Sequence, residues 1–182
     1  MTRTVYYAAT TLDGFLADEQ DSLDWLFKQD QDEQGPLNYA EFIEQVGVLA
    51  MGATTYDWIR RHLAATGEAW AYDLPSYVFT HREPEPIDGA DVRFASGAVS
   101  GAYDEIAAAA GERDVWVVGG GDLAAQFAEA GHLDEMIVYI APVTVGAGRP
   151  LFPRRWDFRL LQLAQNRAFA CARYEVVGPL AD

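Results

Sequence analysis

Short runs of apolar and β-branched residues alternate along the chain with longer stretches whose apolar residues recur at helical spacing. The short runs have the length and composition of buried strands; they cover residues 5–10, 48–51, 76–80, 92–94, 115–118 and 135–141. The longer stretches predict helices; they cover residues 39–46, 55–63 and 102–110, and the segment that carries Leu123, Phe127 and Ala130. Strands separated by helices predict right-handed crossovers and a mostly parallel sheet of the α/β class.

The C-terminal third departs from this alternation. Residues 158–164 and 168–177 predict two successive strands in a hairpin, which adds an antiparallel edge to the sheet. Two segments without periodicity predict loops: the acidic stretch that follows Asp13-Gly14, and the glycine-rich segment 145–150.

One segment, VWVVGGGDLAAQF at residues 115–127, joins a buried strand, a glycine turn and a helix. Such a junction can point backbone N–H groups at an anion, and the glycines Gly119, Gly120 and Gly121 would let a phosphate approach the bare backbone. The glycines alone do not separate this hypothesis from a plain tight turn between strand and helix. Both interpretations stay open at this point.

Composition limits the classes of function. At 182 residues, half of them hydrophobic, the chain is predicted to fold as a single domain that spans residues 1–182. Its net charge is −15, which should repel nucleic acid and anionic membranes, so neither is an expected partner. Much of the acid lies between Asp18 and Glu33, a pattern typical of a solvated loop.

The chain has a single cysteine, Cys171, which rules out an internal disulfide and a cysteine-rich zinc site. No metal site is predicted. The N-terminal segment lacks the apolar core of a signal peptide, and no apolar run approaches the roughly 18 residues of a membrane helix. These features predict a cytoplasmic protein.

Four motifs occur in an order and at spacings that resemble a known superfamily. They are ATTLDGFLAD, MGATTYDW, YVFTHR and VVGGGDLAAQF, which begin at Ala9, Met51, Tyr77 and Val117. Together they resemble the dihydrofolate reductase-like superfamily, in particular the C-terminal reductase domain of the bifunctional riboflavin-biosynthesis deaminase–reductase. The later segment APVTVGAGRPLF is more similar to that riboflavin-pathway branch than to true dihydrofolate reductases. The resemblance implies a three-layer α/β/α fold, a mostly parallel sheet with the antiparallel hairpin at its edge.

The resemblance also implies NADPH as the cofactor. Its pyrophosphate would lie at the glycine turn, where the family has a cis peptide that would be Gly119–Gly120, and opposite Thr54 and Thr55, which would cap the helix there. His81 and Arg82 would bind the ribose 2′-phosphate, a dianion that needs cationic and hydroxyl donors. The cofactor-binding residues that the resemblance implies are Ala9, Leu16, Gly52, Thr54, Thr55, Thr80, His81, Arg82, Val118, Gly119, Gly120, Gly121, Asp122 and Leu123.

Ala9 and Leu16 would flank the nicotinamide, with Asp13-Gly14 as part of a mobile loop over it. Hydride transfer needs the donor carbon close to its acceptor and water excluded. The substrate-binding candidates are Asn38, whose position the resemblance implies, and Trp25, Phe42 and Tyr139 as walls of the pocket. Each of the three aromatic residues fits the ordinary core equally well, and both interpretations stay open.

Two residues depart from the pattern of dihydrofolate reductase. Ala53 stands where that enzyme usually has an arginine against the 2′-phosphate, so a preference for NADPH would rest on His81 and Arg82. Asn38 stands where the pterin-binding carboxylate is usual, and an amide cannot serve as an acid. Glu41 or Asp24 could substitute, but no spacing places either one. No catalytic residue is assigned.

The sequence therefore predicts an oxidoreductase that uses NADPH to reduce a small heterocyclic substrate, pterin-like or riboflavin-precursor-like, or a carbonyl compound. The paired cysteines of a zinc deaminase are absent, so only the reductase half of the riboflavin enzyme is matched. A phosphoribosyl substrate would need a basic pocket, for which the only clustered candidates are Arg149, Arg154 and Arg155.

Two alternatives from other classes remain. One is a non-catalytic dinucleotide-binding module that has lost its substrate-site acid; the other is a protein whose surface serves only oligomer assembly. A homodimer is expected, both from the resemblance and from the large apolar residues of the C-terminal third, among them Leu151, Phe152, Trp156, Phe158 and Phe169.

Overall fold

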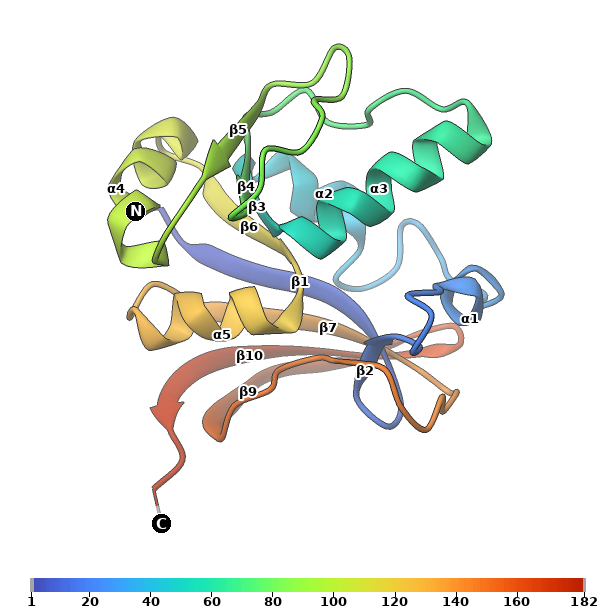
Figure 1. Cartoon of the computed structure of the whole chain (residues 1–182). Coiled ribbons are helices and arrows are strands. Elements are labelled where there is room, and N and C mark those ends of the chain that lie inside the picture. The colour runs from blue at the N-terminus through green and yellow to red at the C-terminus, as the bar shows by residue number, and fades with distance from the viewer. Residues whose placement is uncertain (1, 182) are drawn as a thin grey trace.

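The computed structural model describes residues 2–181 and has a twisted eight-stranded sheet at its centre (Figure 1). The strands of this sheet are β1 (Thr4–Thr11), β3 (Val46–Gly52), β4 (Ser76–Phe79), β5 (Val92–Ala95), β6 (Asp114–Gly119), β7 (Glu135–Ala141), β9 (Trp156–Asn166) and β10 (Phe169–Pro179). Two short strands, β2 (Phe15–Ala17) and β8 (Arg149–Pro150), form a separate two-stranded sheet. The helices are α1 (Asp24–Phe27), α2 (Tyr39–Glu44), α3 (Ala53–Thr66), α4 (Val99–Ala110) and α5 (Gly121–Glu129).

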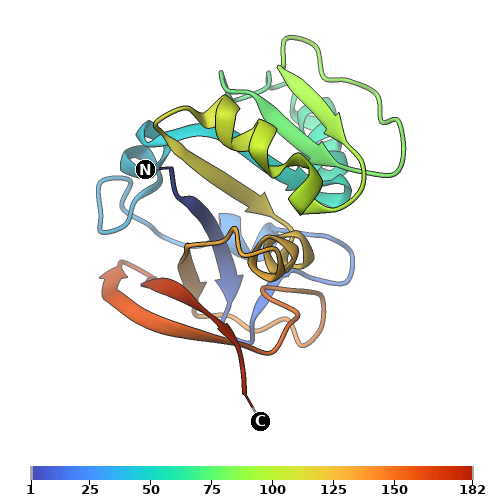
Figure 2. The same cartoon turned by 90° about the vertical axis from the view of Figure 1, so that its left-hand side faces the viewer.

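The order of strands across the sheet is β5-β4-β3-β6-β1-β7-β10-β9. The first six are parallel, while β10 is antiparallel to both β7 and β9. The predicted fold class, with its antiparallel C-terminal hairpin, is confirmed. Figure 2 shows this hairpin curving along the edge of the sheet on the side away from β5.

Helices cover both faces of the sheet because successive residues of its central strands are apolar on both sides. In β3, Val48 and Ala50 join a buried cluster that includes Ile106 of α4 and Phe127 of α5. The intervening Leu49 and Met51 join a cluster on the other face with side chains of α2 and α3. This two-sided burial is typical of a parallel sheet between helical layers.

The N-terminal loop is more ordered than predicted. Its residues 15–17 form β2, which pairs with the two-residue strand β8, and residues 24–27 form the single turn α1. A Cβ at Gly148 would lie 2.0 Å from the carbonyl oxygen of Ala17, so only glycine allows this approach. The pairing joins segments more than 130 positions apart, and three-residue strands have too little periodicity to be predicted.

Most of the apolar residues that suggested a dimer belong to the core instead. Phe169 is buried, and the other four named residues pack against the buried cluster below α5. The exposed large apolar side chains of this region are different ones: Leu160, Leu161 and Leu163 on the edge strand β9, Val177 on β10, and Leu180. Within residues 2–181, no helix combines the length and apolar character needed to span a membrane.

Candidate functional site

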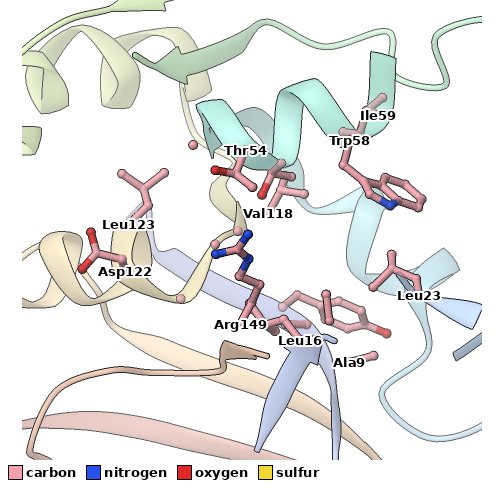
Figure 3. Close-up of a pocket in the computed structure, with 18 of the residues that line it drawn as sticks. Ala9, Leu16, Leu23, Thr54, Trp58, Ile59, Val118, Asp122, Leu123 and Arg149 are labelled. Atoms are coloured by element: carbon pink, nitrogen blue, oxygen red, sulfur yellow. The ribbon is translucent and has the colours of Figure 1, made fainter. Parts of the chain in front are cut away.

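A cavity of about 990 Å³ opens at the carboxyl ends of β1, β3 and β6. The adjacent strands β3 and β6 send their following helices to opposite faces, since Tyr56 of α3 and Phe127 of α5 are buried in different clusters. A crevice forms where neighbouring connections diverge in this way, and ligands of open α/β sheets bind there. Figure 3 shows the cavity between the start of α5, the start of α3 and the segment around Leu23.

Two helices begin at this cavity with glycine N-caps. Gly52 precedes α3 and Gly120 precedes α5, and neither helix has a capping hydrogen bond from the N-cap side chain. The predicted cap by Thr54 or Thr55 is therefore wrong; both residues lie inside the first turn, where they line the cavity. First-turn N–H groups without a capping side chain are donors for an anion, and the two helix dipoles favour negative charge.

The three glycines of the central turn have different structural roles. The peptide between Gly119 and Gly120 is cis, as the resemblance implied. Gly119 has a φ of 150°, which favours glycine, and a Cβ there would lie 3.4 Å from the Thr55 hydroxyl oxygen. A Cβ on Gly121 would lie 2.3 Å from the carbonyl oxygen of Pro150, so Gly121 is needed for packing against β8. A Cβ on Gly120 would meet no atom within 4 Å. Gly120 is thus the position where bare backbone leaves space open rather than filled by protein.

His81 and Arg82 follow β4, and only the first of the two lies at the cavity. Thr80 and His81 line the cavity, whereas Arg82 does not. The Arg82 guanidinium donates to the carboxylate of Asp57 in α3 at 2.7 Å, and its side chain is 66% exposed. The Thr80 hydroxyl accepts the Arg82 backbone N–H at 3.0 Å, which orders the turn.

Ala9, Leu16 and Val118 come from three different segments and meet in the middle of the cavity (Figure 3). The loop that precedes Leu16 is fastened by Asp13, which accepts the Thr11 hydroxyl at 2.5 Å and the backbone N–H of Gly146 at 2.8 Å. These hydrogen bonds, the one from Thr11 first, hold the pKa of Asp13 below its usual value. Asp13 therefore ties the loop over the cavity to the glycine-rich segment 145–150.

Arg149 reaches into the cavity from β8, near Thr54 and Leu16 (Figure 3). Its Nε donates to Oδ1 of Asp21 at 2.5 Å, and this hydrogen bond lowers the pKa of Asp21. The sequence placed Arg149 in a basic cluster with Arg154 and Arg155, but Arg154 pairs with Asp122 and Glu129 on α5 instead.

The end of the cavity away from α5 is aromatic, and the sequence did not single out most of its residues. Trp116 lies at the centre, with the ring of Tyr39 at 5.6 Å and that of Tyr72 at 5.7 Å between centroids. Trp58 lines the same end from α3. Trp116 lies in the strand that its apolar neighbours predict. The sequence around residues 39 and 72 carries no signal that these two tyrosines pack against it.

The substrate-binding candidates divide into two groups. Tyr139 lines the cavity, and its hydroxyl donates to the carbonyl oxygen of Pro36 at 2.7 Å. Trp25 and Phe42 are buried in the clusters behind the wall and are not among its lining residues. Asn38 caps α2: its side chain accepts the Glu41 N–H at 2.9 Å and donates to the carbonyl oxygen of Gly35. This amide is 3% exposed and is not at the cavity, so the structure does not bring it to a substrate.

The model of the RibD C-terminal domain family matches residues 4–173. The uncharacterized protein YwjB of Bacillus subtilis strain 168 is 29% identical over 171 residues, which are 93% of this chain and 94% of YwjB.

Three solved structures share the fold. A protein from Shewanella sp. PV-4 that is named for riboflavin biosynthesis has a TM-score of 0.81 at 23% identity, covering 97% of this chain and 99% of its own. The deaminase/5-amino-6-(5-phosphoribosylamino)uracil reductase of Thermotoga maritima has a TM-score of 0.64 at 16% identity, covering 97% of this chain and 57% of its own. Dihydrofolate reductase of Enterococcus faecalis, solved with NADP(H), has a TM-score of 0.56 at 15% identity, covering 96% of each chain. The dihydrofolate reductase-like fold is thereby confirmed.

Proposed function

The chain belongs to the RibD C-terminal domain family, and from this premise we propose that it is an NADPH-dependent oxidoreductase. It reduces a small heterocyclic or carbonyl substrate by hydride transfer, in the manner of a dihydrofolate reductase-like or 5-amino-6-(5-phosphoribosylamino)uracil reductase-like enzyme. The neighbouring fold of a dihydrofolate reductase solved with NADP(H) supports the choice of cofactor.

The observation that carries the proposal is the pair of glycine-capped helix starts facing one cavity. Gly52 and Gly120 leave first-turn N–H groups of α3 and α5 without a capping side chain, and Thr54 and Thr55 add hydroxyls beside them. Several converging N–H and hydroxyl donors can bind a pyrophosphate without a cationic side chain when the positive ends of two helix dipoles face it. This donor set fits a dinucleotide.

The remaining cofactor contacts follow the length of the cavity. His81 and Thr80 would meet the adenosine ribose, and Arg82 would reach the 2′-phosphate after leaving Asp57. Ala9, Leu16 and Val118 would flank the nicotinamide, which supplies the hydride when the cofactor is bound. The loop fastened by Asp13 would keep water from the reacting carbon.

The substrate also needs a proton. The carboxylates among the described lining residues, Asp21 and Asp122, are both in ion pairs with arginines. The hydroxyls of Tyr39 and Tyr72, or solvent, would therefore deliver the proton to the reduced substrate.

A second candidate is a dinucleotide-binding module without catalysis. Asn38 favours this candidate, because the position usual for a substrate-binding carboxylate holds an amide instead. That amide caps α2 and supplies no acid to the cavity. Titration with NADPH, followed by cofactor fluorescence, tests the site that both candidates share. Oxidation of NADPH with a panel of pterins, flavin precursors and carbonyl compounds separates them. Saturable binding with turnover supports the reductase, binding without turnover supports the module, and absence of binding contradicts both.

A further inference from the structure

We propose that the substrate end of the cavity binds an uncharged, flat aromatic carbonyl compound and discriminates against phosphorylated or carboxylated substrates. The proposal deepens the reductase function and rests on it for the reaction, although the preference for an uncharged ligand can be measured without turnover. It separates this chain from an enzyme that would reduce a ribosyl-phosphate substrate.

The shape of the substrate end is set by rings. The indole of Trp116 meets the phenol rings of Tyr39 and Tyr72 at centroid distances of 5.6 and 5.7 Å, and the ring of Tyr7 at 6.4 Å. Trp58 of α3 and Leu23 beside α1 lie across from Ala9 and Leu16 (Figure 3). Aromatic walls of this kind favour a flat apolar ligand, because stacked and edge-to-face contacts add to the burial of its area.

The polar atoms of the ring cluster formed by Trp116, Tyr7, Tyr39 and Tyr72 fall into two classes. The Tyr7 hydroxyl donates to the carbonyl oxygen of Leu37 at 3.0 Å, and the Trp116 N–H to that of Tyr7 at 3.2 Å, so both present only ring surface. Within the described chain, the hydroxyls of Tyr39 and Tyr72 have no hydrogen-bond partner. Burial raises the pKa of both phenols, so they stay neutral and can each donate to a carbonyl oxygen.

Charged side chains are few at the cavity wall, and the two nearest the substrate end form an ion pair with each other. Among the described residues that line it, the acidic and basic side chains are Asp21, His81, Asp122 and Arg149. His81 and Asp122 lie toward the proposed adenosine and pyrophosphate positions, and Asp21 and Arg149 neutralise each other at 2.5 Å. An anionic substrate would leave water for a site whose nearest cation, Arg149, is already paired with Asp21, in a chain whose net charge is −15. Both terms oppose its binding.

The reaction balances with NADPH as the reductant. Its hydride, carrying two electrons, forms a C–H bond at the carbonyl carbon while the C=O π bond breaks. The electron pair moves to oxygen, which takes one proton from water or a tyrosine hydroxyl. The products are NADP⁺ and an aromatic alcohol.

A matched series of probes with one ring system tests the preference. Dissociation constants of the full-length chain are measured by isothermal titration for 2-naphthaldehyde, 6-formyl-2-naphthoate, 2-naphthyl phosphate and 2-naphthylmethylammonium, with and without saturating NADP⁺. We expect 2-naphthaldehyde to bind at least ten-fold more tightly than either anion and more tightly than the cation. Equal or tighter binding of any charged probe overturns the proposal.

A substitution that adds a cation to the substrate end supplies the converse test. Leu23→Lys should increase affinity for 2-naphthyl phosphate several-fold. The matched control is Leu180→Lys, an exposed leucine outside the cavity that changes the net charge by the same amount. If Leu180→Lys raises phosphate affinity as much as Leu23→Lys does, net charge and not this site excludes anions, and the proposal fails.

The same titrations separate this inference from the proposed function. Saturable NADPH binding with no preference for the neutral probe rejects the substrate class and leaves the reductase in place. A neutral-probe preference without NADPH binding rejects the reductase and leaves the ligand class supported.

Discussion

Arg82 should make the chain prefer NADPH over NADH, and its contacts allow the size of the preference to be estimated. A charge-assisted contact to the 2′-phosphate contributes about 1.5–3 kcal/mol. To make it, Arg82 gives up its ion pair with Asp57, which at 66% exposure of the arginine is worth roughly 0–1 kcal/mol. The net contribution is about 0.5–3 kcal/mol, or roughly a two- to hundred-fold change in affinity.

Two substitutions test this exchange of partners in opposite directions. Arg82→Ala should weaken NADPH binding within that range and leave NADH binding unchanged. Asp57→Asn frees the guanidinium and should tighten NADPH binding, by up to about five-fold if the lost pair is worth roughly 1 kcal/mol. Both are read from fluorescence titrations at one fixed salt concentration, because the contact is screened.

Equal losses for NADPH and NADH in Arg82→Ala would show that this arginine does not contact the 2′-phosphate. Weaker NADPH binding by Asp57→Asn would show that Asp57 positions Arg82 rather than competing for it. Either result refutes the reasoning, and the first would leave His81, which the sequence pattern also assigned to the phosphate, as the remaining candidate.

Three further outcomes are expected. Gly121→Ala should lower the free energy of unfolding by about 1–3 kcal/mol in urea titrations, because its Cβ would overlap backbone carbonyl oxygens of β8 and the residue after it; unchanged stability would contradict that packing. Asp13→Asn should lower the hydrogen-exchange protection factors of the Val145 and Gly146 amides. In the unsubstituted chain, acidification through the lowered pKa of Asp13 should also lower these factors, which are observed rates compared with the intrinsic rate at the same pH, since only the carboxylate accepts both bonds fully. Light scattering should give the mass of a homodimer, with the exposed leucines of β9 covered by the second copy; the 20.1 kDa mass of one chain would reject it.

The order of elements could be predicted because each depends on local pattern. The central strands are buried on both faces, so β3 and β6 read as continuous apolar runs, and their parallel pairing follows from the helices between them. The position of the glycine turn could also be predicted, because the buried strand before it and the helical spacing after it are local patterns. Its separate roles could not: the need for glycine at 121 comes from a carbonyl of Pro150, and only the folded chain brings the two together.

The cavity residues that the sequence missed are those that long-range packing brings together. Tyr39, Tyr72 and Trp116 come from α2, a loop and β6, and each by itself looks like an ordinary core residue. Asn38 shows the opposite failure. Its position matched a family motif, but Asn before a helix with Glu three positions later is also a capping pattern, and the local hydrogen bonds decide for the cap.

The most direct test of the central claim is NADPH binding by Gly120→Val. A Cβ on Gly120 meets no protein atom within 4 Å, and its φ of −79° suits any residue, so the variant should keep the stability of the parent. The new side chain would fill the space proposed for the pyrophosphate, and we expect NADPH affinity to fall at least a hundred-fold. Gly178→Val is the matched control, since a Cβ on Gly178 of β10 also meets nothing within 4 Å and lies away from the cavity. A folded Gly120→Val variant that binds NADPH as tightly as Gly178→Val would contradict the account.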